Sequence, residues 1–175
     1  MVAGRIHRTD IGGCDAGYDD TYGSNFDPHL RITVIHTTHQ GTLCALKTAS
    51  ALAKDLCVRI GLVATQVVPF RLPLEEPLVS TNFLRQRQGL LVSEAGIDEE
   101  AVAIEVYLCR DPKVVLQQSL APRSLIVLGG KRGWWRAGQR LGKWLTRMGH
   151  QVIFADLGRY RLGAEKPLRV TQRLL

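Results

Sequence analysis

Hydrophobic residues recur along the middle of the chain with two periods that alternate. Short β-branched or wholly apolar runs are typical of buried strands, and they occupy five stretches: 32–35, 60–68, 101–108, 125–128 and 152–154. Between these runs, apolar residues recur at intervals of three and four, as on one face of a helix. The alternation predicts an α/β fold with an open, mostly parallel five-stranded sheet and helices on both of its faces.

Polar caps and glycines mark the ends of the predicted helices. Thr42 is the expected N-cap of the first helix, and Asp111 with Pro112 is a strong helix start. A carboxylate accepts hydrogen bonds from free amides, and proline fits the first helical position. The buried side of the second helix is expected to hold four residues: Phe83, Leu84, Leu90 and Leu91.

Two flanking segments show neither period. Residues 1–30 hold five Asp and five Gly and are predicted to be a polar acidic arm, whereas residues 157–175 are predicted to be a basic tail. The α/β domain is therefore expected over residues 31–156.

The net charge of +7 is distributed unevenly over the chain. It divides into −3 over residues 1–30, +1 over residues 31–130 and +9 over residues 131–175. A general basic coat is therefore absent, and nucleic acid is not an expected partner.

The apolar runs and the cysteines indicate in which cellular compartment the protein is expected. No run approaches the roughly 18 apolar residues of a membrane span, and the first ten residues are polar where a signal peptide needs an apolar block. Cys14, Cys44, Cys57 and Cys109 have no paired spacing, so we expect reduced thiols, with the last three buried and inert. These features predict a cytoplasmic protein without a transmembrane segment.

A glycine-rich, basic stretch follows the fourth predicted strand. Six of the 17 glycines lie between Gly129 and Gly149. Glycines let backbone amides turn toward an anion, and a helix N-terminus adds partial positive charge, so a phosphate-binding loop is one interpretation. The other is a glycine-punctuated turn whose basic residues form a solvated helix face.

Over about residues 31–156 the chain resembles the universal stress protein family of nucleotide-binding domains, which has a Rossmann-like, adenine nucleotide alpha hydrolase-like fold. Family members that bind ATP carry Gly, two residues, Gly, nine residues, then Gly with Ser or Thr. Gly130 and Gly133 match the first pair, but eight residues separate Gly133 from Gly142, and Lys143 replaces the hydroxyl residue. The ATP-binding motif is therefore degenerate.

The resemblance implies a ligand site. Gly130, Gly133 and Gly142 would meet the phosphates of ATP or a related nucleotide, and Lys143 would supply charge. The opposite wall would be formed by His36, where the family commonly has Asp, together with Thr37 and Thr38. A nucleotide-free member of the family is the competing possibility, and either form is expected to be a homodimer.

Other chemistry finds less support in the residues. His36, His39 and Cys44 suggest a metal site, since the two histidines lie three apart, but no further His is near in sequence, so no metal site is expected. No nucleophile elbow, Walker loop or pair of strand-end carboxylates indicates catalysis, and no catalytic residue is predicted. We therefore predict a nonenzymatic binding or regulatory module. The alternatives are a nucleotide-hydrolysing enzyme on the same fold, or a module that binds a protein or an anionic surface through its basic last quarter.

Overall fold

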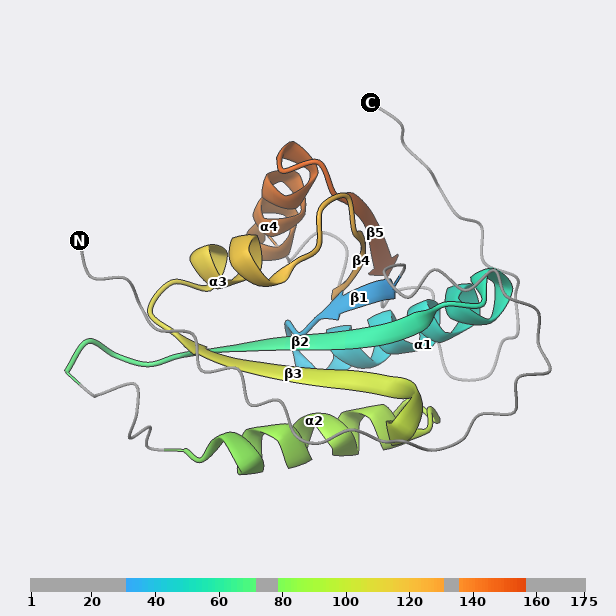
Figure 1. Cartoon of the computed structure of the whole chain (residues 1–175), viewed down its shortest axis with the longest axis horizontal. Helices are drawn as coiled ribbons and strands as arrows, with labels where there is room; N and C mark the ends of the chain where they lie inside the picture. The colour runs from blue at the N-terminus through green and yellow to red at the C-terminus, as the bar shows by residue number, and fades with distance from the viewer. Residues whose placement is uncertain (1–30, 72–78, 131–135, 157–175) are drawn as a thin grey trace.

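The computed structural model describes residues 31–71, 79–130 and 136–156, in which strands and helices alternate (Figure 1). The strands are β1 (Arg31–Ile35), β2 (Arg59–Val67), β3 (Val102–Cys109), β4 (Leu125–Gly130) and β5 (Gln151–Asp156). The helices are α1 (His39–Leu56), α2 (Thr81–Glu94), α3 (Pro112–Ser119) and α4 (Arg136–Arg147), with a short 3-10 turn, η1 (Glu99–Ala101). The predicted arm and tail, and Gly133, lie outside the described residues.

The strands form one five-stranded parallel sheet in the order β3-β2-β1-β4-β5. The predicted α/β class is confirmed. The chain first winds outward from β1 through β2 to β3, then crosses back to place β4 on the other side of β1. The winding therefore reverses between β1 and β4, where Ile32 pairs with Leu125 and Val34 with Val127.

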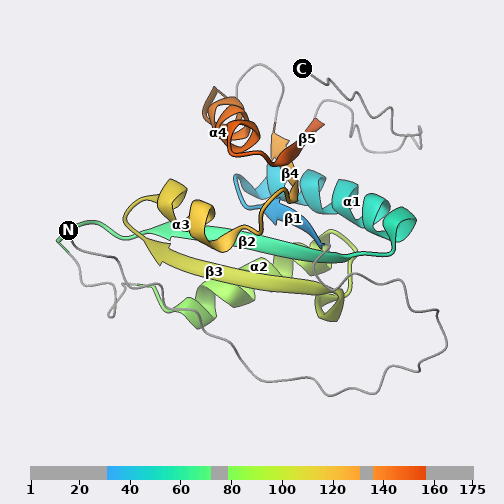
Figure 2. The ribbon, with the colours of Figure 1, turned by 45° about the horizontal axis from the view of Figure 1, so that its top comes forward.

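Two helical layers cover the sheet, and each has its own core (Figures 1 and 2). On one face, α1 and α2 bury Leu46 and Val92 against Val34 and Leu62. On the other face, α3 and α4 bury Leu116 and Leu145 in a second cluster with strand residues such as Ile35 and Leu128. Because the strands are covered on both faces, β4 could be read from sequence as a continuous apolar run.

The first helix begins earlier than its pattern predicts. Thr38, not Thr42, is the N-cap of α1, and its side chain accepts a hydrogen bond from the amide of Gly41. The predicted start at Asp111 and Pro112 is confirmed, since Asp111 caps α3. A cap at Thr38 brings the first turn of α1 into the loop that leaves β1.

The predicted buried side of α2 is half wrong. Leu84 and Leu91 are buried, but Phe83 is 57% exposed and Leu90 is 70% exposed. Gln88 and Val92 take the inner positions instead. Gln88, Leu91 and Val92 lie four, seven and eight positions after Leu84, a helical spacing that the adjacent apolar pairs obscured.

The described helices can be compared with the needs of a bilayer only through their length and composition. None of them combines the length and the apolar composition that a bilayer span requires.

Candidate functional site

The candidate site lies where β1 and β4 end side by side. In open α/β sheets, ligands bind outside the carboxyl ends of the strands at the point where the winding reverses. Here that point is followed on the β1 side by His36, Thr37 and Thr38, and on the β4 side by the glycine-rich loop. The N-terminus of α1 lies at the same end of the sheet, and we call the region at these strand ends the crevice.

Two glycines fix the base of this crevice. A Cβ atom at Gly129 would lie 1.8 Å from the carbonyl oxygen of Gly41, and one at Gly41 would lie 2.5 Å from that of Gly129. No side chain fits either position without moving backbone. The first turn of α1 therefore packs directly on the end of β4.

Three threonine hydroxyls tie the loop together. Thr37 Oγ1 donates to the carbonyl oxygen of Gly129 at 2.9 Å, which links the β1 loop to β4. Thr42 Oγ1 accepts from the amide of Thr37 at 3.2 Å and donates to the carbonyl oxygen of Thr38 at 2.8 Å. Thr37 and Thr38 thus have structural partners, and they shape the wall that the sequence assigned to a ligand.

His36 is half-buried at the end of β1, and its amide donates to the carbonyl oxygen of Val63 at 2.8 Å. Burial lowers the pKa of the imidazole, and the positive charges of Arg87 and His39 lower that pKa further. A neutral imidazole offers one donor and one acceptor to a ligand.

A cation from α2 also belongs to this environment. Arg87 is exposed and close enough to act electrostatically on His36. On the surface, His39 Nε2 lies 3.1 Å from Glu94 Oε2. Sequence reasoning missed Arg87 because nothing in the pattern of α2 indicates that its charge acts on His36.

Of the predicted glycines and lysine that the structure describes, Gly130 lies in β4, and Gly142 and Lys143 lie in α4. Gly130 ends β4 next to Gly129 and pairs with Asp156 of β5. Gly142 lies inside α4, where a Cβ atom would be 2.2 Å from Cζ of Phe154. An amide that deep in a helix is used by the helix itself, so the structure gives Gly142 a packing role. Lys143 is exposed on the same helix.

Three of the four cysteines lie in the described residues. Cys44 and Cys109 are buried, and burial together with Asp156 raises the pKa of Cys44 to about 11. Cys57 is exposed, so the prediction that it is buried was wrong. It is the C-cap of α1 in the left-handed conformation, with φ of 52°. No cluster of three or more His, Cys, Asp or Glu within the described ranges could hold a metal.

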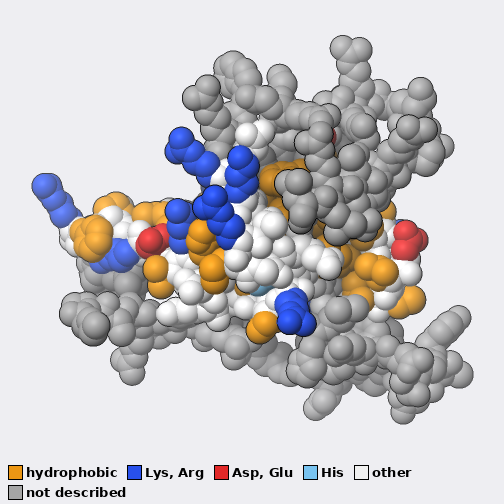
Figure 3. Space-filling model, turned by 90° about the horizontal axis from the view of Figure 1, so that it is seen from above, with side chains coloured by type: hydrophobic (Ala, Val, Ile, Leu, Met, Phe, Trp, Pro, Cys, Tyr) orange, Lys and Arg blue, Asp and Glu red, His pale blue; other side chains and the backbone are white. Residues whose placement is uncertain are grey.

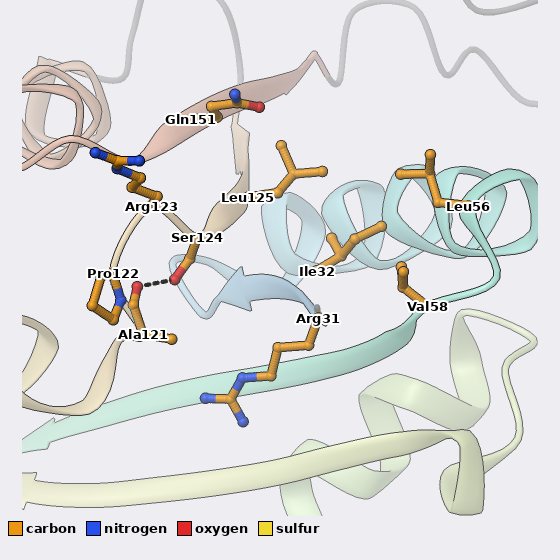
Figure 4. Close-up of a pocket in the computed structure, with 10 residues that line it drawn as sticks. All are labelled: Arg31, Ile32, Leu56, Val58, Ala121, Pro122, Arg123, Ser124, Leu125 and Gln151. Carbon is orange, nitrogen blue, oxygen red and sulfur yellow. Dashed lines mark hydrogen bonds between the residues drawn. The ribbon is translucent and has the colours of Figure 1, made fainter. Parts of the chain in front are cut away.

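A separate cavity of about 300 Å³ lies at the opposite, amino-terminal edge of the sheet (Figure 4). Its lining includes Arg31, Leu56, Val58, Arg123, Ser124 and Gln151, none of which the sequence singled out for a ligand. Arg31 NH1 lies 2.6 Å from Glu105 Oε1. The predicted ligand-site residues at the ends of β1 and β4 lie at the opposite, carboxyl-terminal edge of the sheet.

No protein-family model matches the chain, and no curated protein sequence matches it. Solved structures of universal stress proteins are similar to it. One, a universal stress protein in complex with cAMP, is 12% identical with a TM-score of 0.44, over 73% of this chain and 98% of its own. Another, from the universal stress protein family of Burkholderia pseudomallei, is 17% identical with a TM-score of 0.45, over 73% of this chain and 96% of its own.

Proposed function

We propose that the chain is a nonenzymatic, universal stress protein-like module that binds ATP or a related nucleotide in the crevice between β1 and β4. One observation carries the proposal. The N-terminus of α1 is locked against the end of β4 by Gly41 and Gly129, at the point where the sheet reverses. The first turn of α1 contains no acidic residue, so its positive end faces the crevice without a competing carboxylate.

Each side of the crevice has a proposed part in binding. Backbone amides at Gly130 and Gly133 meet the phosphates, and Arg87 adds positive charge from α2. On the β1 side, neutral His36 supplies one donor and one acceptor to a ribose hydroxyl or base edge, while Thr37 and Thr38 hold the wall.

The motif that the resemblance suggested is shortened in this proposal. Gly142 is left out because its amide lies within α4, and exposed Lys143 contributes only long-range charge. Binding then depends on fewer phosphate contacts than the full family motif provides. We propose a homodimer as the assembly, which light scattering of the purified chain would test.

Calorimetry and thermal unfolding of the full chain with ATP, ADP, AMP and cAMP, with and without magnesium, test the proposal. A ligand at about 100 times its Kd stabilises the folded state by about 2.7 kcal/mol. Gly130→Asp places a carboxylate where the phosphates are proposed and should abolish the binding heat. Asn82→Asp, an exposed position on α2, makes the same charge change and should retain it.

The outcomes separate the alternatives. An absence of heat and of stabilisation with every nucleotide at millimolar concentration would overturn the proposal and favour the nucleotide-free module. Equal loss of binding in both variants would show that the crevice is not the site. Release of ADP or AMP from bound ATP, lost in Gly130→Asp, would instead favour the hydrolysing enzyme.

A further inference from the structure

The second half of the domain contains no acidic residue over a long stretch. Between Asp111 and Asp156 the chain has eight Lys and Arg residues and no Asp or Glu. This stretch supplies α3, β4, α4 and most of β5. Because α3 and α4 together form one helical layer, this excess of basic residues lies on one face of the sheet.

The described basic side chains of this layer point to solvent. Five are exposed: Lys113, Arg123, Arg140, Lys143 and Arg147, which we call the basic face. In the view onto α3 and α4, the blue side chains gather over these helices (Figure 3). None of the five forms an ion pair with another residue in the described part of the chain.

The helix α4 has its basic residues on one side and its buried residues on the other. Arg140, Lys143 and Arg147 follow one another at intervals of three and four, so they lie on one side of the helix. Leu145, which is fully buried, lies on the other side and packs in the core with α3. The cations are therefore displayed from a rigid support.

Acidic residues collect elsewhere. Glu94, Asp98, Glu99 and Glu100 lie at the end of α2 and in η1, all exposed, in the layer on the opposite face of the sheet. The α1 and α2 layer also exposes Lys47, Lys54 and Arg87, so its charge is mixed. An approaching polyanion is therefore attracted most strongly to α3 and α4, which contain no Asp or Glu.

We propose that the basic face binds the phosphate backbone of a nucleic acid without reading its sequence. Backbone phosphates are recognised by arrays of Lys and Arg, and their neutralisation releases condensed counterions. A membrane is less well matched, because the apolar side of α4 is used in the core and is not free to enter a bilayer. Nucleic acid was not an expected partner on sequence grounds, because the positive charge is not spread over the whole chain. The proposed binding requires only one face on which the positive charge is concentrated.

Fluorescence anisotropy with a labelled single strand and a duplex of about 30 nucleotides tests the proposal on the full chain. If about five phosphates are neutralised, affinity should fall by about 10²–10³-fold between about 50 and about 200 mM salt. The variant Lys113→Gln/Arg140→Gln/Arg147→Gln should lower the salt slope by about 2 to 3.

A matched variant separates the basic face from net charge. Lys47→Gln/Lys54→Gln/Arg59→Gln removes three exposed cations from α1 and β2 and should bind as the unmodified chain does. Circular dichroism establishes that both variants are folded. Equal weakening in the two variants, an unchanged salt slope in the first, or no binding at low salt would each overturn the proposal. So would tighter binding to anionic phospholipid vesicles than to nucleic acid at equal phosphate concentration.

Discussion

The two helical layers of this fold differ in what they do with the same sheet. In the layer of α1 and α2, the first turn of α1 contacts the end of β4 directly, with no side chain between the two backbones. In the layer of α3 and α4, two shorter helices bury one side and display on the other side cations that form no ion pair with a described residue. The candidate site of the first layer thus depends on a close contact between two backbones, whereas that of the second layer depends on the charge of exposed side chains.

The largest effect is expected from a substitution that separates the backbone of α1 from that of β4. Gly129→Ala puts a methyl group 1.8 Å from the carbonyl oxygen of Gly41, so α1 must move away from β4. We expect a loss of about 3 kcal/mol or more in the free energy of unfolding, at the upper end for overpacking. Urea unfolding measures it.

Gly61→Ala is the matched control in the same sheet. Its nearest neighbour is the flexible side chain of Arg31 at 3.6 Å, an ordinary contact, so the change should stay below about 1 kcal/mol. Equal losses at Gly129 and Gly61 would contradict the special role of the α1 contact.

The same residues show what could be predicted from the sequence. Periodicity identified the strands and helices, because apolar spacing reflects burial directly. It did not indicate the strand order or the contact of Gly41 with Gly129, since these positions are 88 residues apart and have no side chains to form a pattern. Likewise, the proximity of Arg87 to His36 depends on how α2 is rotated, and the apolar pattern misjudged that rotation.

The second effect is a moderate one in the opposite layer. Gly142→Ala meets the ring of Phe154 at 2.2 Å, but that ring is half exposed and can move. We expect a loss of about 1 to 2 kcal/mol, because alanine in a helix returns up to about 1 kcal/mol. Thermal unfolding of the single variants and of Gly142→Ala/Phe154→Ala measures the coupling.

The double variant sharpens the interpretation. If Phe154 causes the clash, Gly142→Ala should be neutral or stabilising once the ring is removed. A loss that persists in the Phe154→Ala background would instead indicate that the glycine is needed for the backbone of α4.

A smaller effect is expected at the threonine link. Thr37→Val keeps the shape of the side chain but removes the hydroxyl that donates to the carbonyl oxygen of Gly129. Loss of one such bond should cost about 0.5 to 1.5 kcal/mol. Thr146→Val is the control in α4, where the hydroxyl bonds only within its own helix at Gly142, and should cost less. An equal cost by urea unfolding would mean that the link between β1 and β4 carries no special weight.

The smallest expected effect distinguishes the histidines of the two regions. Burial lowers the pKa of both His36 and His150, but only His36 is also affected by Arg87. The unfolded chain therefore protonates first, so each histidine contributes stability above pH about 6.5 that is lost as pH falls through its folded pKa. NMR titration of Arg87→Gln should raise the pKa of His36 and leave that of His150 unchanged. An unchanged His36 would remove Arg87 from the crevice, whereas a parallel shift in His150 would mean that the substitution altered the fold rather than a local charge.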